Sequence, residues 1–371
     1  MVQPKFIAFY LPQFHPIPEN DKWWGPGFTE WVNVAQARPL FRGHEQPHIP
    51  ADLGFYDLRL PETREKQAEL AREAGIEAFC YWHYWFGNGK QLLERPFNEV
   101  LSSGKPDFPF CLAWGNHTWS KKQWEPKNPE KDVVLIKQEY PGAEDYKAHF
   151  YSLLPAFKDH RYFKVNGKLF FVIYSMEDSD DVPTFIKTWR QLARENGLND
   201  FYFVGTDSDC RWKDKILAKG FDAVYDNNVL NIHHHQSLLH KVFLQFQRSI
   251  LKRPTSFRYK DAIKYMVTEN ARRRDVIPTI AANWDHSPRS AHKGIILTHC
   301  EPKYFQQVAE MAIDAVKDKP EDEQIILIKS WNEWGEGNYI EPDLKYGHGY
   351  LKALRNAIDK YCNRSISPDR T

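Results

Sequence analysis

The chain has 371 residues, enough for one large barrel or two ordinary domains, and in either case enough to bury a full core. Its 50 Lys and Arg residues almost balance its 49 Asp and Glu residues, so we expect no large single-sign field that attracts nucleic acid or an anionic membrane surface. Aromatic residues make up 15% of the chain, which favours a carbohydrate partner because such rings stack on the apolar faces of sugars; a core of large side chains is the alternative.

Eight short apolar runs bounded by turn residues predict eight buried strands, because parallel strands covered on both faces are continuously apolar. In chain order they are Phe6–Leu11, Ile76–Trp85, Phe108–Trp114, Leu169–Tyr174, Phe201–Gly205, Phe221–Tyr225, Val276–Ala282 and Gln324–Ile328. Helical stripes with a period near 3.6 occupy residues 62–74, 146–157, 305–316 and 351–361. The alternation predicts an α/β fold, a (β/α)₈ TIM barrel that forms a single catalytic domain over residues 1–371.

Two long excursions interrupt this alternation. Residues 12–60, after the first strand, contain repeated Pro and Gly residues and are predicted to be ordered loop rather than helix. Residues 228–272, after the sixth strand, contain His233–His235 and an amphipathic basic stretch. Because loops that follow strands lie on the catalytic face of a barrel, we expect both excursions to shape a cleft.

Side chains just past the carboxyl end of a barrel strand face the active site, and this rule selects candidate substrate-binding residues. Two of them have an ordinary structural alternative, because Asp285 is also a good helix cap and His83 a plausible core histidine. The candidates are His15, His83, Tyr84, Trp114, Asn116, Asp226, Trp284 and Asp285, with Asp207 a further acidic group after the fifth strand.

The segment after the eighth strand gives the most specific pattern. Glu333 and Glu336 are three residues apart, and glycines at 335 and 337 let the backbone aim both carboxylates at one small volume. We expect Trp331 and Trp334 to supply apolar walls, which raise a carboxyl pKa by penalising its charged form. One carboxyl then serves as general acid and the other as base or nucleophile on a glycosidic bond; two exposed loop glutamates are the alternative. Substrate-binding candidates in this segment are Trp331, Asn332 and Trp334.

Two other patterns are weaker. Asp207 and Asp209 form a DxD, the pattern through which metal-dependent glycosyltransferases hold a nucleotide sugar, but short matches are common by chance and no GxGxxG is present. For His233–His235 we predict a solvated loop rather than a metal site, because neighbouring side chains diverge on a strand or a helix.

The five cysteines are odd in number, widely spaced and without a CxxC pair, which is typical of reduced thiols in a cytoplasmic protein. The apolar stretch Phe6–Leu11 is too short for a signal-peptide core, and no apolar run reaches the length of a membrane span. We therefore expect a cytoplasmic protein with no membrane insertion, a trimmed leader being the alternative.

A set of short motifs extends over nearly the whole chain. It consists of Ala8–His15, Trp23–Gly25, Gly27–Trp31, Gln46–His48, Tyr56–Arg59, Phe79–Tyr81, His83–Phe86, Trp284–Asp285, Ser287–Arg289, and Trp331–Trp334 with Glu336–Gly337. Together these motifs resemble the WbsX-type proteins, a glycoside hydrolase family 99-like group often encoded among bacterial surface-polysaccharide genes.

Family 99 enzymes are barrels that cleave within α-mannosides with retention, so the resemblance implies the same fold and reaction class. It implies that Glu333 deprotonates the 2-hydroxyl of the substrate to give a 1,2-anhydro sugar, and that Glu336 is the general acid/base. It implies no metal and no cofactor. Gly335 stands where the family motif has a histidine, and His117 stands where a glutamate is expected, so the resemblance leaves the sugar open.

We therefore expect a retaining glycoside hydrolase that acts on a bacterial surface or other complex polysaccharide, with no nucleic acid partner. The oligosaccharide or polysaccharide substrate is expected to stack on Trp31, Trp114 and Trp284. A glycosyltransferase of lipopolysaccharide, O-antigen or capsule biosynthesis is the first alternative, although familiar sugar-nucleotide transferases use Rossmann-like sheets. A non-catalytic glycan-binding barrel is the second.

Overall fold

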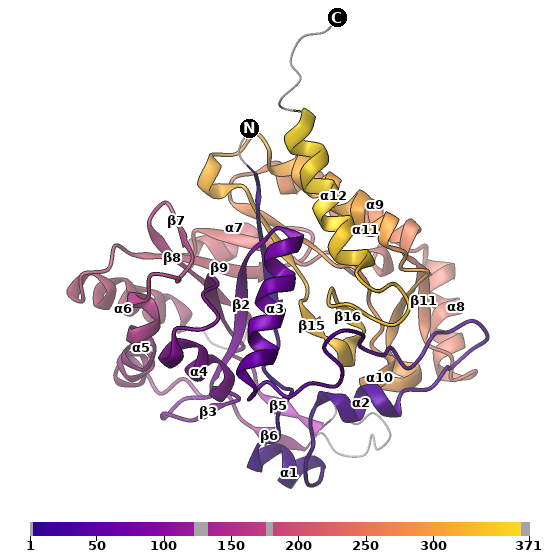
Figure 1. The fold of residues 1–371 in the computed structure, drawn as a ribbon, viewed down its shortest axis with the longest axis horizontal. Helices are drawn as coiled ribbons and strands as arrows, with labels where there is room; N and C mark the ends of the chain where they lie inside the picture. The colour runs from indigo at the N-terminus through magenta and orange to yellow at the C-terminus, as the bar shows by residue number, and fades with distance from the viewer. Residues whose placement is uncertain (1–2, 122–132, 176–180, 365–371) are drawn as a thin grey trace, which may run out of the picture.

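The centre of the fold is a closed barrel of eight parallel strands (Figure 1). The structure is a computed structural model and describes residues 3–121, 133–175 and 181–364. Each strand pairs with the next along the chain, and the last pairs with the first, so the predicted (β/α)₈ barrel is confirmed. The strands are β1 (Lys5–Tyr10), β2 (Ile76–Trp85), β4 (Phe110–Trp114), β8 (Lys168–Ile173), β9 (Phe201–Asp207), β10 (Ala223–Asp226), β12 (Val276–Ile280) and β14 (Ile325–Ile328).

The strands are continuously apolar because both of their faces are buried. All four residues of β14 are buried, and inside the barrel the ring of Phe9 stacks on Trp82 with centroids 5.0 Å apart. On the outer face Phe171 packs against Trp189 of a covering helix, with centroids 4.9 Å apart. Burial of each such side chain contributes about 1.5–3 kcal/mol, which is why the apolar runs alone were enough to predict the strands.

Helices cover the outside of the barrel, and the four predicted helical stripes lie in α3, α5, α11 and α12. Each helix presents its apolar stripe to the strands, as Trp189, fully buried, does from α6. The covering helices are α3 (Pro61–Ala74), α4 (Arg95–Ser103), α5 (Ala143–Lys158), α6 (Val182–Glu195), α7 (Lys213–Ala218), α11 (Pro302–Val316) and α12 (Gly349–Arg364).

The first excursion, residues 12–60, contains two short helices, so the prediction of loop rather than helix was wrong. These are α1 (Pro18–Trp24) and α2 (Glu30–Gln36). Pro18 occupies the first turn of α1, where a missing N–H breaks no hydrogen bond. At α2 the Thr29 hydroxyl accepts a hydrogen bond from the Trp31 N–H at 3.3 Å. Prolines that we took for helix breakers therefore include one that starts a helix.

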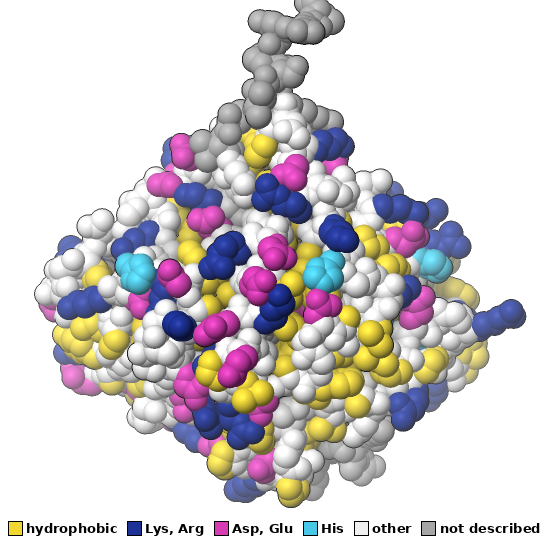
Figure 2. Space-filling model, in the orientation of Figure 1, with side chains coloured by type: hydrophobic (Ala, Val, Ile, Leu, Met, Phe, Trp, Pro, Cys, Tyr) yellow, Lys and Arg dark blue, Asp and Glu magenta, His cyan; other side chains and the backbone are white. Residues whose placement is uncertain are grey.

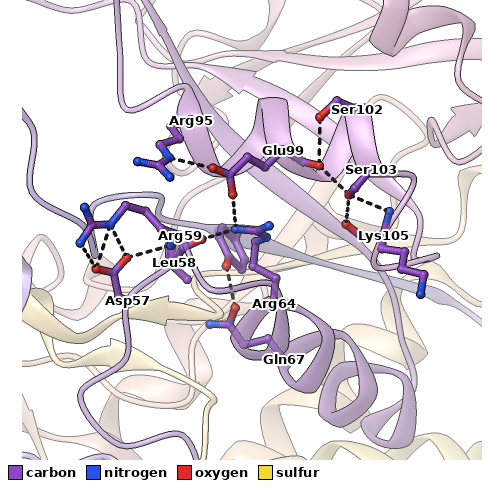
Figure 3. Close-up of polar contacts among 11 residues, drawn as sticks. Asp57, Leu58, Arg59, Arg64, Gln67, Arg95, Glu99, Ser102, Ser103 and Lys105 are labelled. Atoms are coloured by element: carbon purple, nitrogen blue, oxygen red, sulfur yellow. Dashed lines mark hydrogen bonds and ion pairs between the residues drawn. The ribbon is translucent and has the colours of Figure 1, made fainter.

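A buried arginine fixes the end of this excursion to the helices beside it (Figure 3). Arg64 of α3 donates to the carbonyl of Leu58 at 2.5 Å and to the carboxylate of Glu99, on α4, at 2.8 Å. Arg95 donates to the other oxygen of Glu99 at 2.7 Å. Because Arg64 is buried, these charge-assisted hydrogen bonds are stronger than exposed ones, and they hold residues 57–60 in place.

The second excursion, after β10, carries α8 (Leu238–Ser249), β11 (Thr255–Arg258) and α9 (Tyr259–Met266). Strand β11 pairs in parallel with β13 (Ile295–Thr298), which follows the short helix α10 (Ser287–Ser290). The Tyr259 hydroxyl donates to the carbonyl of Ala281 at 2.5 Å and so ties α9 to the end of β12. The excursion is therefore a small subassembly attached to the side of the barrel.

Acidic and basic side chains are interspersed over the face of the molecule in Figure 2, in keeping with the balanced composition. All five cysteines are free thiols. Within the described ranges, no helix combines the length and the apolar character needed to cross a bilayer.

Candidate active site

A tight hairpin after the eighth barrel strand carries the predicted carboxyl pair. It consists of β15 (Asn332–Glu333), a single 3-10 turn over Trp334–Glu336, and β16 (Asn338–Tyr339). Gly337 closes the turn with a φ of +51°, and a Cβ there would lie 2.7 Å from Asp285, so only glycine fits. The hairpin follows the carboxyl end of β14, the end of the barrel at which active sites form.

Glu333 is buried, and its carboxyl accepts a hydrogen bond from the Ser330 hydroxyl at 2.6 Å. Burial raises its pKa above the ordinary value, and the negative charge of Glu336 raises it further. The cations Lys329 and Arg289 act in the opposite direction without cancelling these effects. Compared with an ordinary glutamate, Glu333 is therefore shifted towards its neutral, protonated form.

Glu336 differs because it pairs directly with a buried arginine. Arg289 donates through Nη1 to Glu336 Oε1 at 2.6 Å, and the Nε2 of His286 lies 3.5 Å from the same oxygen. Burial alone raises the pKa of Glu336, but the charge of Arg289, with a contribution from His286, outweighs burial and holds that pKa well below its usual range. The pKa values of two glutamates three residues apart are thus shifted in opposite directions.

Arg289 also holds a third carboxylate that sequence analysis missed. Its Nε donates to Oε2 of the fully buried Glu30, on α2, at 3.0 Å. A Cβ on Gly335 would lie 1.7 Å from this same oxygen. The Glu30 carboxylate thus occupies the space of a side chain at position 335, where the resemblance led us to look for a histidine. Thr29, Glu30 and Arg289 lie in stretches that carry the resemblance, which was their one signal in the sequence.

Lys329 is a second missed residue, although it directly follows β14. Its Nζ lies 5.0 Å from the centroid of the Trp284 ring. Burial lowers the pKa of Lys329, but the charges of Glu336 and Glu333 raise it more, so the ammonium form is retained. The rule for strand ends covers polar side chains of every kind, and it also selects Lys329, which we did not include among the candidates.

Among the predicted substrate-binding residues, Tyr84 and Trp284 lie near the carboxyl pair. The Tyr84 ring comes within 2.7 Å of where a Cβ on Gly115 would be, so this glycine makes room for it. Burial raises the pKa of the Tyr84 hydroxyl, and the charge of Glu333 raises it further. Tyr84 therefore remains protonated and able to donate a hydrogen bond.

Three other candidates, at or just past the ends of β2 and β4, are engaged in structural contacts. His83 contacts His149 of α5, with their Nε2 atoms 2.8 Å apart. The indole of Trp114 donates to the carbonyl of Trp85 at 2.9 Å, and its ring packs on Phe185 of α6. Asn116 is fully buried and accepts a hydrogen bond from the backbone of Ser175 at 2.7 Å. His83 and Trp114 thus brace the barrel against its helices, and Asn116 ties the loop after β4 to the loop after β8.

A model of the family described as "Glycosyltransferase WbsX" matches residues 6–354 of this chain. The chain belongs to the WbsX family. Two curated relatives, each called "Uncharacterized protein WxcX" and from two strains of Xanthomonas campestris pv. campestris, are 33% identical over 360 residues. The match covers 95% of this chain and 49% of each relative, so the chain spans about half the length of these curated relatives.

Solved structures share the fold of this WbsX family member. A GH99 endo-alpha-mannosidase from Bacteroides thetaiotaomicron superposes with a TM-score of 0.57 at 15% identity, covering 99% of this chain and 100% of that one. A structure described as a glycoside hydrolase-like protein superposes with a TM-score of 0.59 at 16% identity, covering 96% and 94%. At such identities the likeness shows the barrel fold alone.

The tryptophans of the WbsX hairpin, which we expected to form apolar walls for the carboxyl pair, are buried in other contacts. The indole of Trp334 donates to Glu341 Oε2 at 2.6 Å, and Trp331 is fully buried against Phe79, with ring centroids 5.2 Å apart. The Trp31 ring packs on Trp334 at 5.7 Å and on Phe14 at 4.6 Å, measured between ring centroids. The Asn332 amide instead bonds to both backbone groups of Leu11 and so ties the hairpin to β1.

Glu341 is a buried carboxyl that sequence analysis did not single out. Besides Trp334, it accepts hydrogen bonds from Tyr56 at 2.9 Å and from Gln67 at 2.7 Å. Burial raises its pKa to about 7, and these donors offset only part of the effect. It lies in the layer between the barrel and α3.

Asp285, which follows β12, holds the first excursion of the WbsX chain against the barrel. Its Oδ2 accepts from His44 and Gln46 at 2.7 Å each, and its Oδ1 accepts from the Ser287 N–H at 2.9 Å. Burial raises the pKa of Asp285, but the hydrogen bond from His44 and nearby histidine charge lower it overall. A cavity of about 390 Å³ is lined by Trp284 and Asp285 but not by the carboxyl pair.

The remaining acidic and histidine candidates lie apart from these contacts. Asp226 accepts from Asn228 at 2.6 Å, and burial raises its pKa to about 6. Both oxygens of Asp207 accept backbone N–H groups, so the DxD forms a turn. His15 is buried, which lowers its pKa to about 4. Among described residues, no group of three or more His, Cys, Asp or Glu side chains has a metal-binding arrangement; His233–His235 is no exception.

Proposed function

We propose that this chain is a retaining glycoside hydrolase that acts on a bacterial surface or other complex polysaccharide, with Glu333 and Glu336 as its catalytic carboxyl groups. The observation that carries the proposal is the position of this pair at the carboxyl end of the barrel, where burial raises the pKa of Glu333 and Arg289 lowers that of Glu336. Hydrolysis of a glycosidic bond needs one carboxyl that holds a proton and one that is ionised near neutral pH. Burial shifts Glu333 towards the first state, and Arg289 holds Glu336 in the second.

The surroundings of the pair support Glu333 as the proton donor to the leaving oxygen. Glu336, held ionised by Arg289, would remove the proton from the 2-hydroxyl of the sugar. That oxygen then attacks the anomeric carbon as the bond to the leaving group breaks, giving a 1,2-anhydro sugar. In the second step Glu333, now a carboxylate, takes a proton from water, which opens the three-membered ring, and Glu336 returns its proton to the 2-oxygen. Both carboxyls regain their starting states.

The family resemblance assigns the two roles the other way round, and dependence on the leaving group distinguishes the assignments. An aryl glycoside with an acidic phenol needs little protonation to depart, so loss of the acid slows its cleavage far less than that of a natural linkage. We expect Glu333→Gln to retain most activity on the activated substrate and Glu336→Gln to lose it. The reverse pattern would restore the assignment implied by the resemblance.

Tyr84, Trp284 and Lys329 supply substrate contacts in this proposal. Tyr84 donates from its hydroxyl, Lys329 donates from its ammonium group, and the Trp284 ring offers an apolar face. His117 remains a proposed position for sugar discrimination, because it stands where the resemblance leads us to look for a glutamate. Trp31 and Trp114, which we expected to stack on the substrate, are engaged in packing instead.

The first experiment is to incubate the protein with a panel of bacterial polysaccharides and, separately, with sugar nucleotides. New reducing ends that disappear in both Glu333→Gln and Glu336→Gln support the hydrolase. The matched control is Glu195→Gln, an exposed residue on α6, which is expected to keep full activity. Nucleotide release that survives both active-site changes would overturn the proposal in favour of a glycosyltransferase, and binding without turnover would indicate a glycan-binding barrel.

A further inference from the structure

The second excursion exposes an unusual amount of apolar surface along α8 and just beyond it. Leu239 is 84% exposed and Leu238 is 78% exposed, at positions where an ordinary amphipathic helix is polar. Exposed apolar side chains normally occur singly, and a contiguous set marks a surface that contacts something else. The set consists of Leu238, Leu239, Val242, Phe243, Phe246, Ile250 and Leu251, which we call the α8 apolar face.

The geometry of the helix directs this face away from the protein. At about 100° per residue, the side chains from 238 to 250 in the set fall within an arc of about 140°. Leu244 lies on the opposite side of the helix and is 5% exposed, so α8 rests on the rest of the chain through a narrow edge. In Figure 1 the helix lies at the right-hand margin of the molecule, outside β11.

The charge around the α8 apolar face has one sign. Residues 227–260 contain no Asp or Glu. Lys241 and Arg248 lie on one flank of the arc, and Lys252 and Arg248 are close enough to His292 to lower its pKa, after the larger effect of its burial. In the described part of the chain, Lys241, Arg248 and Lys252 form no ion pair with a carboxylate. Figure 2 shows dark blue and yellow side chains together at the edge where Figure 1 draws α8.

We propose that α8 is an interfacial helix that binds this chain to an anionic bilayer, with its apolar face in the headgroup layer and its lysine and arginine side chains on lipid phosphates. A wide apolar face flanked by basic residues is the pattern of helices that lie in the plane of a membrane. Pairing of two copies through this face is disfavoured, because it brings the acid-free segments 227–260 together and their like charges repel. The helix lies on the membrane and does not span it.

The test is flotation of the full chain with vesicles of phosphatidylcholine alone and of phosphatidylcholine mixed with phosphatidylglycerol. We expect flotation with the anionic vesicles only, weakened by added salt. Leu239→Ser/Phe243→Ser/Phe246→Ser is expected to abolish it, and Arg248→Gln/Lys252→Gln to weaken the partition coefficient about fivefold for each charge removed. All five side chains lie on α8 or just after it, and circular dichroism should show a folded protein.

Matched controls lie on the opposite side of the barrel. Tyr151→Ser on α5 removes an exposed aromatic ring, and Lys187→Gln on α6 removes an exposed cation; both are expected to bind vesicles as wild type does. The proposal is overturned if wild type does not float with anionic vesicles, or if the triple serine variant still floats. A lipid-free dimer that the triple variant dissociates, measured by sedimentation velocity, would also overturn it, because the face would then be a contact between copies.

Discussion

Arg289 sets the charge state of Glu336 through a contact that few side chains can reproduce. Its guanidinium reaches Glu336 with one nitrogen and Glu30 with two others, whereas a lysine offers a single point of charge. In Arg289→Lys we therefore expect the pKa of Glu336 to rise by about one pH unit, the equivalent of one charge-assisted hydrogen bond. Carbon-13 NMR titration of labelled glutamate carboxyls measures this without a substrate.

The matched control for this titration is Arg274→Lys. Arg274 pairs with Glu323 at 2.5 Å, at the amino-terminal end of the barrel, so its replacement should leave Glu336 unchanged. If Arg289→Lys leaves the Glu336 titration where it was, Arg289 is not the cause of the low pKa.

Gly335 is required by the position of Glu30 rather than by its own backbone angles. An added methyl group would lie on the Glu30 carboxylate, so Gly335→Ala must displace α2 or break the contact to Arg289. We expect a loss of about 1–3 kcal/mol in the free energy of unfolding in urea. In a Glu30→Ala background the same change should cost clearly less, and equal costs in the two backgrounds would rule out this clash as the cause.

At the scale of elements, a histidine pair joins β2 to α5. His83 and His149 are buried, and burial lowers the pKa of His83 to about 3 and that of His149 well below its ordinary value. The folded state therefore binds fewer protons than the unfolded chain below about pH 6.5, so stability falls as the pH falls from there. Replacing both with leucine should reduce the loss of unfolding free energy between about pH 6.5 and about pH 4.5 by roughly 4–5 kcal/mol, about half of it from each histidine.

Chemical denaturation at a series of pH values measures this effect. His160→Leu is the control, because His160 is exposed and close to α5 in sequence. It should leave the pH dependence as it is in wild type. If the double leucine variant loses as much unfolding free energy at low pH as wild type does, other buried groups cause the destabilisation by acid.

Elements were predictable from the sequence where one local rule decides them. Strands such as β14 are buried on both faces, so their apolar runs needed no tertiary information. Helix α1 was missed because proline both ends helices and starts them, and only the surrounding chain shows which. Glu333 and Glu336 were found by counting strands, whereas Glu30 meets Arg289 across 259 residues and no local pattern encodes that contact.

At the scale of the whole molecule, the balanced net charge concealed a local imbalance. From 50 cations and 49 anions we expected no attraction to an anionic membrane, yet residues 227–260 contain no acid and include the exposed face of α8. The number of tryptophans in the whole chain was misleading in the same way. Their number suggested sugar stacking, but Trp31, Trp114, Trp331 and Trp334 contribute mainly to packing between the barrel and its surroundings. Net charge and aromatic content are averages over the chain, so they do not show where charged or aromatic side chains lie on the surface.

Glu341 gives the fold a pH dependence of its own. In the unfolded chain its carboxyl titrates near pH 4.5, and in the folded state burial moves its pKa to about 7. Between these values the folded state holds the extra proton, so the stability contributed by this group falls as pH rises, by about 1.4 kcal/mol per pH unit and about 3 kcal/mol in all. Glu341→Gln removes the titration.

Because the glutamine amide cannot accept every donor that faces Glu341, the variant should be less stable than wild type near pH 5. The difference should then narrow steadily towards pH 8, since only wild type loses its proton. Glu69→Gln, on the exposed side of α3, should show no such trend. Unfolding free energies measured in urea from about pH 5 to about pH 8 test this. A difference that stays constant with pH would mean that Glu341 is ionised throughout, with Tyr56, Gln67 and Trp334 together offsetting the cost of burying its charge.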